Sequence, residues 1–139
     1  MNTVTNSLLS IVVPLYNEQD NVVLLTQKIH ESLTGYQYEV IYVDDFSTDE
    51  TRKVVKDMDD DKIHLIELKK NYGQSLALAA GIDYAKGEYI ITMDGDLQND
   101  PSDIPTMLQF AITEEYDVVT GIRQKRKVSL IKKIPSKIA

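Results

Sequence analysis

Short apolar runs alternate with segments of helical period along this chain, which is the pattern of βαβ units around a mostly parallel sheet. The runs are rich in Ile, Val and Tyr, as buried strands usually are. Five strands are predicted, at Leu8–Val13, Tyr38–Val43, Ile63–Leu68, Tyr89–Met93 and Asp117–Thr120. The pattern therefore predicts an α/β fold with a Rossmann-like sheet flanked by helices.

Helix start and stop signals lie between these strands. A first helix is predicted from apolar residues at helical spacing, with Gly35 as its stop signal. A second is predicted after Ser47, where Glu50 three residues later completes a capping box. A fourth is predicted after Asp100, with Pro101 at its first position. The apolar positions of the first helix are Val22, Leu25, Ile29 and Leu33.

The predicted third helix has a stripe of small residues. Gly73, Ala77, Gly81 and Ala85 follow one another at spacings of four and so share one face. Something must approach that face closely. Tight packing against the sheet is the favoured interpretation, and a ligand that passes over the start of the helix is the alternative.

Length and composition indicate one soluble globular domain. The chain has 139 residues, of which 42% are hydrophobic and 27% charged, and no tract resembles a linker. Cysteine is absent, so any metal ion must be held by oxygen or histidine. The sequence contains neither the layout of a signal peptide nor an apolar run long enough to cross a bilayer.

Charge divides the chain into an acidic body and a basic tail. Residues 122–139 hold seven of the 15 Lys and Arg and none of the 22 acidic residues, so the body carries −14 and the tail +7. An acidic body argues against non-specific nucleic-acid binding. We therefore predict a binding domain over residues 1–121 and a basic amphipathic tail over 122–139 that suits an anionic membrane surface. A helix without its packing partner, or plain disorder, is the alternative for this tail.

Acidic residues follow three of the predicted strands, at the edge where ligands of open α/β sheets bind. The three segments are Pro14-Leu15-Tyr16-Asn17-Glu18, Asp44-Asp45-Phe46-Ser47 and Asp94-Gly95-Asp96-Leu97-Gln98. Carboxylates brought together destabilise the fold unless a cation or a proton intervenes. Asp94, Asp96 and the carbonyl oxygen of Gln98 offer the hard oxygen ligands that Mg²⁺ or Mn²⁺ prefers. Taken alone, the Asp-x-Asp pattern is weak, and a simple solvated turn is the alternative.

The first strand-to-helix turn contains no glycine, which excludes a dinucleotide fingerprint or a P-loop there. A diphosphate would then need another counter-charge, which a metal ion at Asp96 would supply. Asp45 could accept a hydrogen bond from a uracil or guanine N–H, with Tyr16 as an aromatic surface beside the base. The alternatives are that Asp44 or Asp45 caps the second helix and that Tyr16 fills a gap near the surface. No Ser/His/Asp arrangement can be assembled.

Taken together, these motifs match a family in order, type and spacing. The motifs include the three segments above, of which the second continues to Thr51 and the third is followed by Pro101. The others are Asn71-Tyr72-Gly73, the small residues Ala77, Gly81, Ala85 and Gly87, and Gly121-Ile122-Arg123. From about Leu9 onward the chain resembles the dolichol-phosphate mannosyltransferase-like branch of family 2 glycosyltransferases, which use polyprenyl phosphates. The resemblance implies a GT-A type fold and a metal-dependent inverting transfer of sugar from a nucleotide-diphosphate sugar to a polyprenyl phosphate.

The resemblance also implies roles for individual residues. Pro14, Tyr16, Glu18 and Asp45 would contact the nucleoside, with Ser47 and Gly73 as further donor-binding candidates. Asp94, Asp96 and Gln98 would lie at the metal ion and the diphosphate, and Arg123 would face the phosphates. We expect Asp94, Asp96 and Arg123 to be the catalytic set. A UDP-sugar is favoured as donor, GDP-mannose is the alternative, and a homo-oligomer is left open.

Relatives of this family continue with acceptor-side and membrane segments, so we expect the chain to be a C-terminally truncated fragment. Such a fragment would retain donor binding and show little transfer, while the full-length protein would lie on the cytoplasmic side of a membrane. Two other functions are considered. One is a nucleotide-sugar binding module without catalysis, and the other is a receiver-like phosphoacceptor domain that binds Mg²⁺. The receiver is disfavoured because its acidic pair would follow the first strand, not the second.

Overall fold

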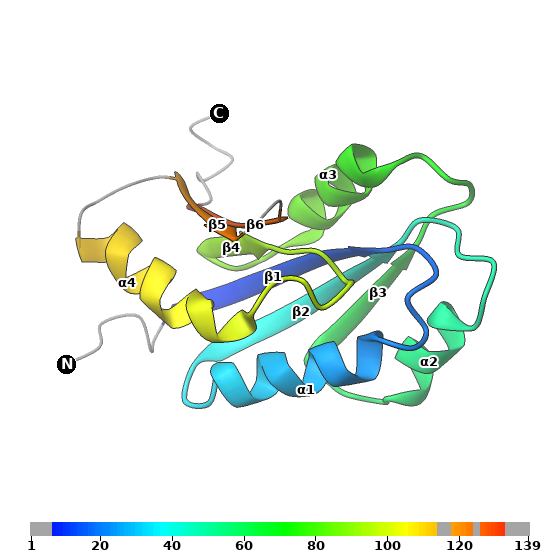
Figure 1. The fold of residues 1–139 in the computed structure, drawn as a ribbon, viewed down its shortest axis with the longest axis horizontal. Coiled ribbons are helices and arrows are strands. Elements are labelled where there is room, and N and C mark those ends of the chain that lie inside the picture. The colour runs from blue at the N-terminus through cyan, green and yellow to red at the C-terminus, as the bar shows by residue number, and fades with distance from the viewer. Residues whose placement is uncertain (1–6, 114–117, 124–125, 133–139) are drawn as a thin grey trace.

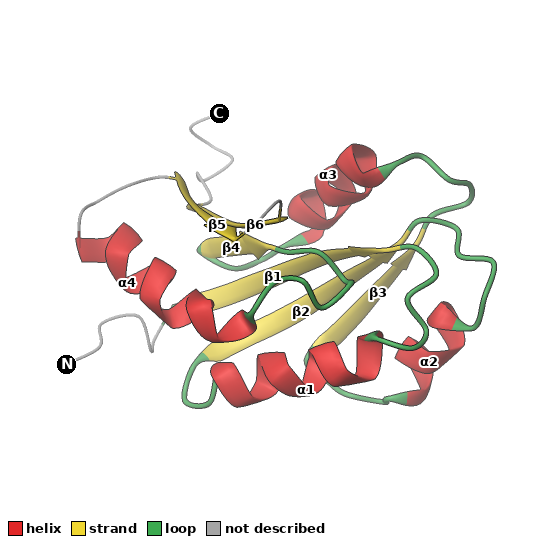
Figure 2. Ribbon diagram, viewed as in Figure 1, coloured by secondary structure: helices red, strands yellow, loops and turns green. Residues whose placement is uncertain are grey.

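The computed structural model describes residues 7–113, 118–123 and 126–132, with side chains described up to Thr113. They form one six-stranded sheet in the order β3-β2-β1-β4-β6-β5, with helices on both faces (Figures 1 and 2). The strands are β1 Leu8–Leu15, β2 Gln37–Asp44, β3 Ile63–Glu67, β4 Tyr89–Thr92, β5 Val118–Arg123 and β6 Arg126–Lys132. The helices are α1 Val22–Ser32, α2 Thr51–Asp57, α3 Gln74–Tyr84 and α4 Ile104–Thr113, with a short 3₁₀ turn, η2 Pro101–Asp103, before α4.

Strand β1 lies at the centre of a parallel core. It pairs with β2 over its whole length, from Leu8 with Gln37 to Leu15 with Asp44, and with β4 on its other side. Strand β3 extends the sheet beyond β2, also in parallel. The first four predicted strands are therefore confirmed to within two residues at each end. Their carboxyl ends meet at one edge, which the next subsection describes.

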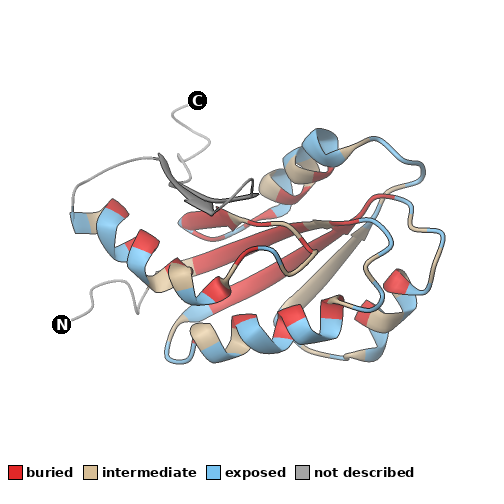
Figure 3. Cartoon of the chain, viewed as in Figure 1, coloured by how far each residue is buried: buried red, intermediate tan, exposed pale blue. Residues whose placement is uncertain are grey.

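Alternating side chains of β1 serve two separate cores. One set, which includes Ile11 and Val13, packs against α1, α2 and α4. The other face carries Val12, which packs with apolar residues of β2 and β4 under α3. Figure 3 shows the result, a buried central sheet between helices whose outer surfaces are exposed. Burial on both faces explains why the strands are nearly continuous apolar runs rather than alternating ones.

The small residues of α3 pack against the sheet, as the favoured interpretation predicted. Ala77 is fully buried and Ala85, at the end of the helix, is 2% exposed. A Cβ added at Gly81 would collide with Cγ1 of Val12 and lie 3.0 Å from Cγ2 of Val43. A larger side chain at this position would push α3 away from β1 and β2.

The structure confirms one predicted helix start and corrects another. Asp100 caps η2 by accepting a hydrogen bond from the Ser102 backbone N–H at 3.0 Å, so the predicted start at Pro101 is confirmed. The capping box of Ser47 and Glu50 is wrong. The Thr51 N–H, at the start of α2, donates instead to the Asp49 carboxylate at 2.9 Å, which leaves Ser47 for another contact.

The sheet continues beyond Gly121, where the sequence suggested that the domain ends. The fifth strand is longer than predicted, and β6, which was not predicted, inserts between β4 and β5 and runs antiparallel to both. Its sequence, with Val128, Leu130 and Ile131 among polar residues, suits a strand as well as an amphipathic helix. Residues 126–132 of the predicted tail therefore belong to the sheet, and residues 133–139 lie outside the described part of the chain. Within the described part, the helices are all too short or too polar to cross a membrane.

Candidate functional site

A cavity of about 270 Å³ opens at the carboxyl edge of β1, β2 and β4, beside the start of α3. Its lining residues are Pro14, Leu15, Tyr16, Glu18, Asp45, Asn71, Gln74, Asp94, Gly95 and Asp96. Six residues predicted from the sequence thus share one cavity: Pro14, Tyr16, Glu18, Asp45, Asp94 and Asp96. Ser47, Gly73 and Gln98 are not among the lining residues. Arg123 ends β5, and its side chain lies outside the described part of the structure.

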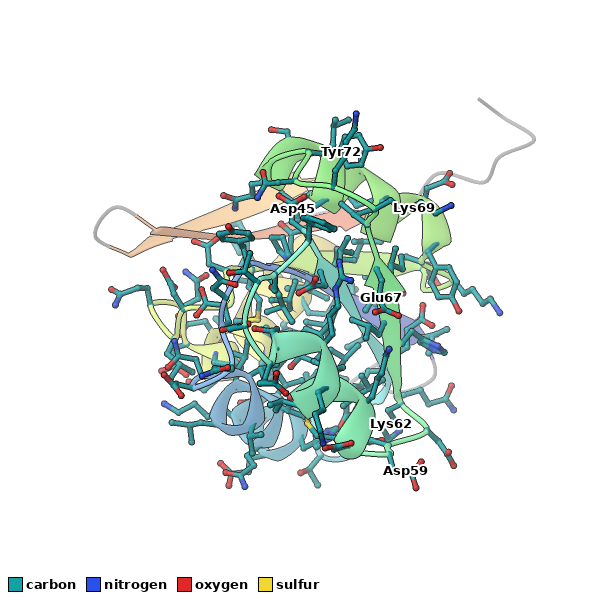
Figure 4. All side chains as sticks on the ribbon, turned by 90° about the vertical axis from the view of Figure 1, so that its right-hand side faces the viewer. Asp45, Asp59, Lys62, Glu67, Lys69 and Tyr72 are labelled. Carbon is teal, nitrogen blue, oxygen red and sulfur yellow. The ribbon has the colours of Figure 1, made fainter. Side chains whose placement is uncertain are left out.

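Asp45 binds the loop that leads into α3. Its side chain is buried, and its two carboxylate oxygens accept hydrogen bonds from the backbone N–H groups of Tyr72 at 2.7 Å and Gly73 at 2.9 Å. The Asn71 amide donates to the Asp45 carbonyl oxygen at 3.3 Å. Figure 4 shows Asp45 and Tyr72 close together beside the start of α3. Asp45 therefore orders this loop, a role that the sequence did not suggest, while its contact with a nucleobase stays a prediction.

Gly73 has a conformational role at the same place. Its φ of 97° lies in the region that favours glycine, and it is the N-cap residue of α3. The chain can therefore turn sharply from the loop into the helix while its N–H points at Asp45. Tyr72, the residue before it, is 45% exposed.

Asp94, Gly95 and Asp96 form a tight turn after β4. The Gln74 side-chain amide donates to Oδ1 of Asp94 at 2.9 Å, and the Gln98 N–H donates to Oδ1 of Asp96 at 3.1 Å. A Cβ added at Gly95 would lie 2.7 Å from a methyl group of Leu15. Any larger residue here would require the Leu15 side chain to shift, so glycine lets this loop pack closely against the end of β1.

These residues fit a divalent ion of the kind predicted. Asp94 and Asp96 bring two carboxylates into one cavity. Among the described residues, the acidic and histidine side chains do not form a group of three that would enclose an ion by themselves. Mg²⁺ commonly binds in this way, through one or two carboxylates, with substrate phosphates and water as its other ligands. Two carboxylates would leave the other positions of such an ion to other ligands.

Ser47 helps to shape the loop after β2. Its N–H and hydroxyl both donate to the fully buried Asp44 carboxylate, at 2.9 and 2.5 Å, and its hydroxyl accepts from the Asn17 N–H at 2.9 Å. Asp44 also forms an ion pair of 2.5 Å with Arg52. Asn17 adopts a φ of 54°, which turns the first loop toward the second. Ser47 thus joins the two loops and lies away from the cavity lining.

Glu18 and Tyr16 also line the cavity. The Glu18 backbone N–H donates to the Thr51 hydroxyl at 2.9 Å, and its side chain accepts from the Asn21 amide at 2.9 Å. Tyr16 is 46% exposed and lines the cavity. Its ring is available as an apolar surface for a ligand.

The acidic residue at the start of α2 is held in its charged form. Burial by itself would raise the pKa of Asp49, but hydrogen bonds from Thr51 and from the Gln19 N–H outweigh it. The pKa of Asp49 therefore lies below its ordinary value. This carboxylate stabilises the loop that carries Ser47 and the start of α2.

Sequence reasoning gave no role to three polar residues at or near the site. Gln74 and Asn71 line the cavity, and Asn99 accepts a hydrogen bond from the Asp94 N–H at 2.8 Å. Asn71 belongs to the recognised Asn71-Tyr72-Gly73 motif, Gln74 follows that motif, and Asn99 follows Gln98. Their position next to recognised motifs was the only indication in the sequence. The hydrogen-bond partners of Asn71 and Gln74 are distant in the sequence, and the contact between Asn99 and Asp94 forms only when the loop folds.

Comparisons with known proteins agree with this geometry. The family model described as glycosyl transferase family 2 matches residues 10–138. A dodecaprenyl-phosphate galacturonate synthase of Rhizobium johnstonii is 44% identical over 135 residues, which are 92% of this chain and 40% of that protein. An undecaprenyl-phosphate 4-deoxy-4-formamido-L-arabinose transferase of Klebsiella pneumoniae is 37% identical, over 93% of this chain and 41% of its own length. The chain therefore spans about two fifths of these relatives.

Solved structures show the same fold. A mannosyltransferase of Pyrobaculum calidifontis in complex with GDP-Man and Mn²⁺ superposes with a TM-score of 0.74 at 20% identity, over 89% of this chain and 44% of that one. Glucosyl-3-phosphoglycerate synthase of Mycobacterium tuberculosis, in complex with Mn²⁺, UDP and glucosyl-3-phosphoglycerate, gives 0.71 at 20% identity, over 86% of this chain and 45% of that one. The fold is of the GT-A type, as predicted. Because the family model covers nearly the whole sequence, the chain belongs to glycosyl transferase family 2.

Proposed function

We propose that this chain binds the nucleoside diphosphate part of a sugar donor, with Mg²⁺ or Mn²⁺ held by Asp94 and Asp96. The observation that carries the proposal is the shared cavity. Asp45 and Tyr16 line it together with the Asp94-Gly95-Asp96 turn. The cavity thus offers a base-binding region and a phosphate-binding region to one extended ligand. The solved relatives named above were studied with GDP-Man or UDP and with Mn²⁺, which supports this assignment.

The chain's own residues bind and orient the donor. Asp45 holds the loop of Asn71 and Tyr72 at the rim, and the exposed Tyr16 ring provides a surface for the base. Asp94 and Asp96 hold the ion, with the carbonyl oxygen of Gln98 as a further ligand candidate. When bound, the ion supplies the positive charge that offsets the diphosphate and stabilises it as it leaves.

The proposed reaction is a single inverting displacement. An oxygen of the acceptor phosphate forms a bond to the anomeric carbon while the bond from that carbon to the nucleoside diphosphate breaks. The nucleoside diphosphate departs with the bonding electron pair from the opposite face. The acceptor oxygen is already anionic, so this step requires no base to remove a proton. Arg123 is proposed to face the phosphates from the end of β5.

A polyprenyl phosphate is the proposed acceptor, because both curated relatives named above carry such a lipid in their names. The whole protein would then act at the cytoplasmic side of a membrane, to which the seven basic residues of segment 122–139 would be attracted. A UDP-sugar is the proposed donor, with GDP-mannose as the alternative. Self-association into a homo-oligomer is compatible with this arrangement.

Calorimetric titration with UDP and with GDP, each with and without Mn²⁺, tests the binding step. We expect one nucleotide to bind more tightly when Mn²⁺ is present, and Asp96→Asn to remove most of this gain. Asp103→Asn serves as the control. It makes the same chemical change in η2, at a residue that does not line the cavity. Failure of both nucleotides to bind in a metal-dependent way would refute the proposal.

A second candidate function is donor binding without transfer by the chain as given. It is favoured by one observation, that the chain spans about two fifths of its curated relatives. Incubation with a radiolabelled nucleotide sugar and a polyprenyl phosphate in detergent distinguishes the two. Binding with little lipid-linked product is the expected result, and efficient transfer would show that these 139 residues suffice.

A further inference from the structure

Gln74 connects two parts of the cavity that are far apart in the sequence. It is the first residue of α3, and its side-chain amide reaches Oδ1 of Asp94, 20 residues later, at 2.9 Å. Gln74 itself lines the cavity and is exposed. Its contact is therefore made within the ligand-binding space and not in the protein interior.

The helix that carries Gln74 is held firmly in place. The two N–H groups just before Gln74, those of Tyr72 and Gly73, donate to Asp45. Ala77, one turn into the helix, is fully buried. Gly81, one turn further along, packs so closely on β1 that no Cβ fits. The start of α3 thus has little freedom to shift, which fixes the backbone position from which the Gln74 side chain reaches Asp94.

Asp94 is held from two sides. Its backbone N–H donates to the buried side-chain oxygen of Asn99 at 2.8 Å, and its carboxylate accepts from Gln74 at 2.9 Å. The first contact fixes the backbone of the turn, and the second fixes the rotation of the carboxylate. A neutral amide can do this without cancelling the negative charge, whereas a lysine or arginine would compete with a cation.

We propose that Gln74 is a positioning residue that orients the Asp94 carboxylate toward a divalent ion bound with the donor diphosphate. The inference rests on the proposed function, because it assumes that Asp94 is a ligand of that ion. Residues that orient metal ligands commonly change metal affinity by about 10-fold to 100-fold when they are replaced.

Gln74→Met provides the test, since methionine is close to glutamine in length and helix propensity but lacks the N–H donor. The quantity measured is the ratio of nucleotide affinities with and without Mn²⁺, by calorimetry on the chain as given, using whichever of UDP and GDP binds more tightly. A direct titration of Mn²⁺ by electron paramagnetic resonance, in the presence of the nucleotide, reports the bound ion. We expect the ratio to fall by about tenfold, with an unchanged melting temperature.

Ser75→Ala is the matched control, because Ser75 is the next residue of the same helical turn, is exposed and does not line the cavity. It should behave as the unmodified chain does. If Gln74→Met keeps the Mn²⁺-dependent gain within twofold, or lowers metal-free binding and melting temperature together, the inference is overturned while the proposed function stands. If the unmodified chain gains nothing from Mn²⁺ with either nucleotide, the proposed function fails and the inference fails with it.

Discussion

Asp45→Asn is the substitution that best tests how the site is organised. The Asp45 carboxylate accepts two backbone hydrogen bonds, at 2.7 and 2.9 Å, from the loop that starts α3. Asparagine keeps one acceptor oxygen and turns an NH₂ group toward the second N–H. One charge-assisted hydrogen bond is therefore lost, which costs about 1.5–3 kcal/mol. For a chain of 139 residues this corresponds to a fall of about 5–10 °C in melting temperature.

The assay is urea-induced unfolding followed by circular dichroism, combined with hydrogen exchange of the loop. We expect the free energy of unfolding to fall by about 2 kcal/mol and the amide protons of Tyr72 and Gly73 to exchange faster. Asp20→Asn is the control, since Asp20 is exposed, and such surface changes stay within about 0.5 kcal/mol. If the free energy of unfolding of Asp45→Asn differs from that of the unmodified chain by less than about 0.5 kcal/mol, the idea that Asp45 organises this loop is refuted.

Three further changes test the packing and electrostatics around the site. Gly81→Ala should lower the free energy of unfolding by about 1–3 kcal/mol, because its methyl group collides with β1, and chemical denaturation measures this. Arg52→Met leaves the fully buried Asp44 without its cation and should cost about 3 kcal/mol, whereas Lys53→Met, which breaks an exposed ion pair, should have a much smaller effect. The pKa of Asp49 is lowered from 3.8, so this group stabilises the fold above that pH and the contribution is lost as the pH falls below it. Acid titrations of stability should therefore be shallower for Asp49→Asn, and identical curves would contradict the reasoning.

The apolar pattern was sufficient to predict much of the fold. Runs of Ile and Val predicted the four parallel strands because a sheet covered on both faces requires nearly continuous apolar segments. The stripe from Ala77 to Ala85 predicted close packing of α3 because only small side chains allow a helix to approach a sheet so closely. Strand β6 escaped this reasoning, because Val128, Leu130 and Ile131 among basic residues suit an interfacial helix equally well. Its place in the sheet depends on pairing with β4, a contact between segments far apart in the chain.

For the site, sequence reasoning named Asp45, Asp94 and Asp96, since acidic residues after parallel strands meet at one edge. How they are held was decided by the tertiary structure. The Ser47–Glu50 capping box failed because Asp44 and Asn17 bind Ser47 in the folded loops. Side-chain hydrogen bonds such as these join residues whose separation in the sequence carries no periodic signal. The sequence by itself therefore determined which chemical groups reach the cavity, whereas only the folded chain decided which of them bind each other.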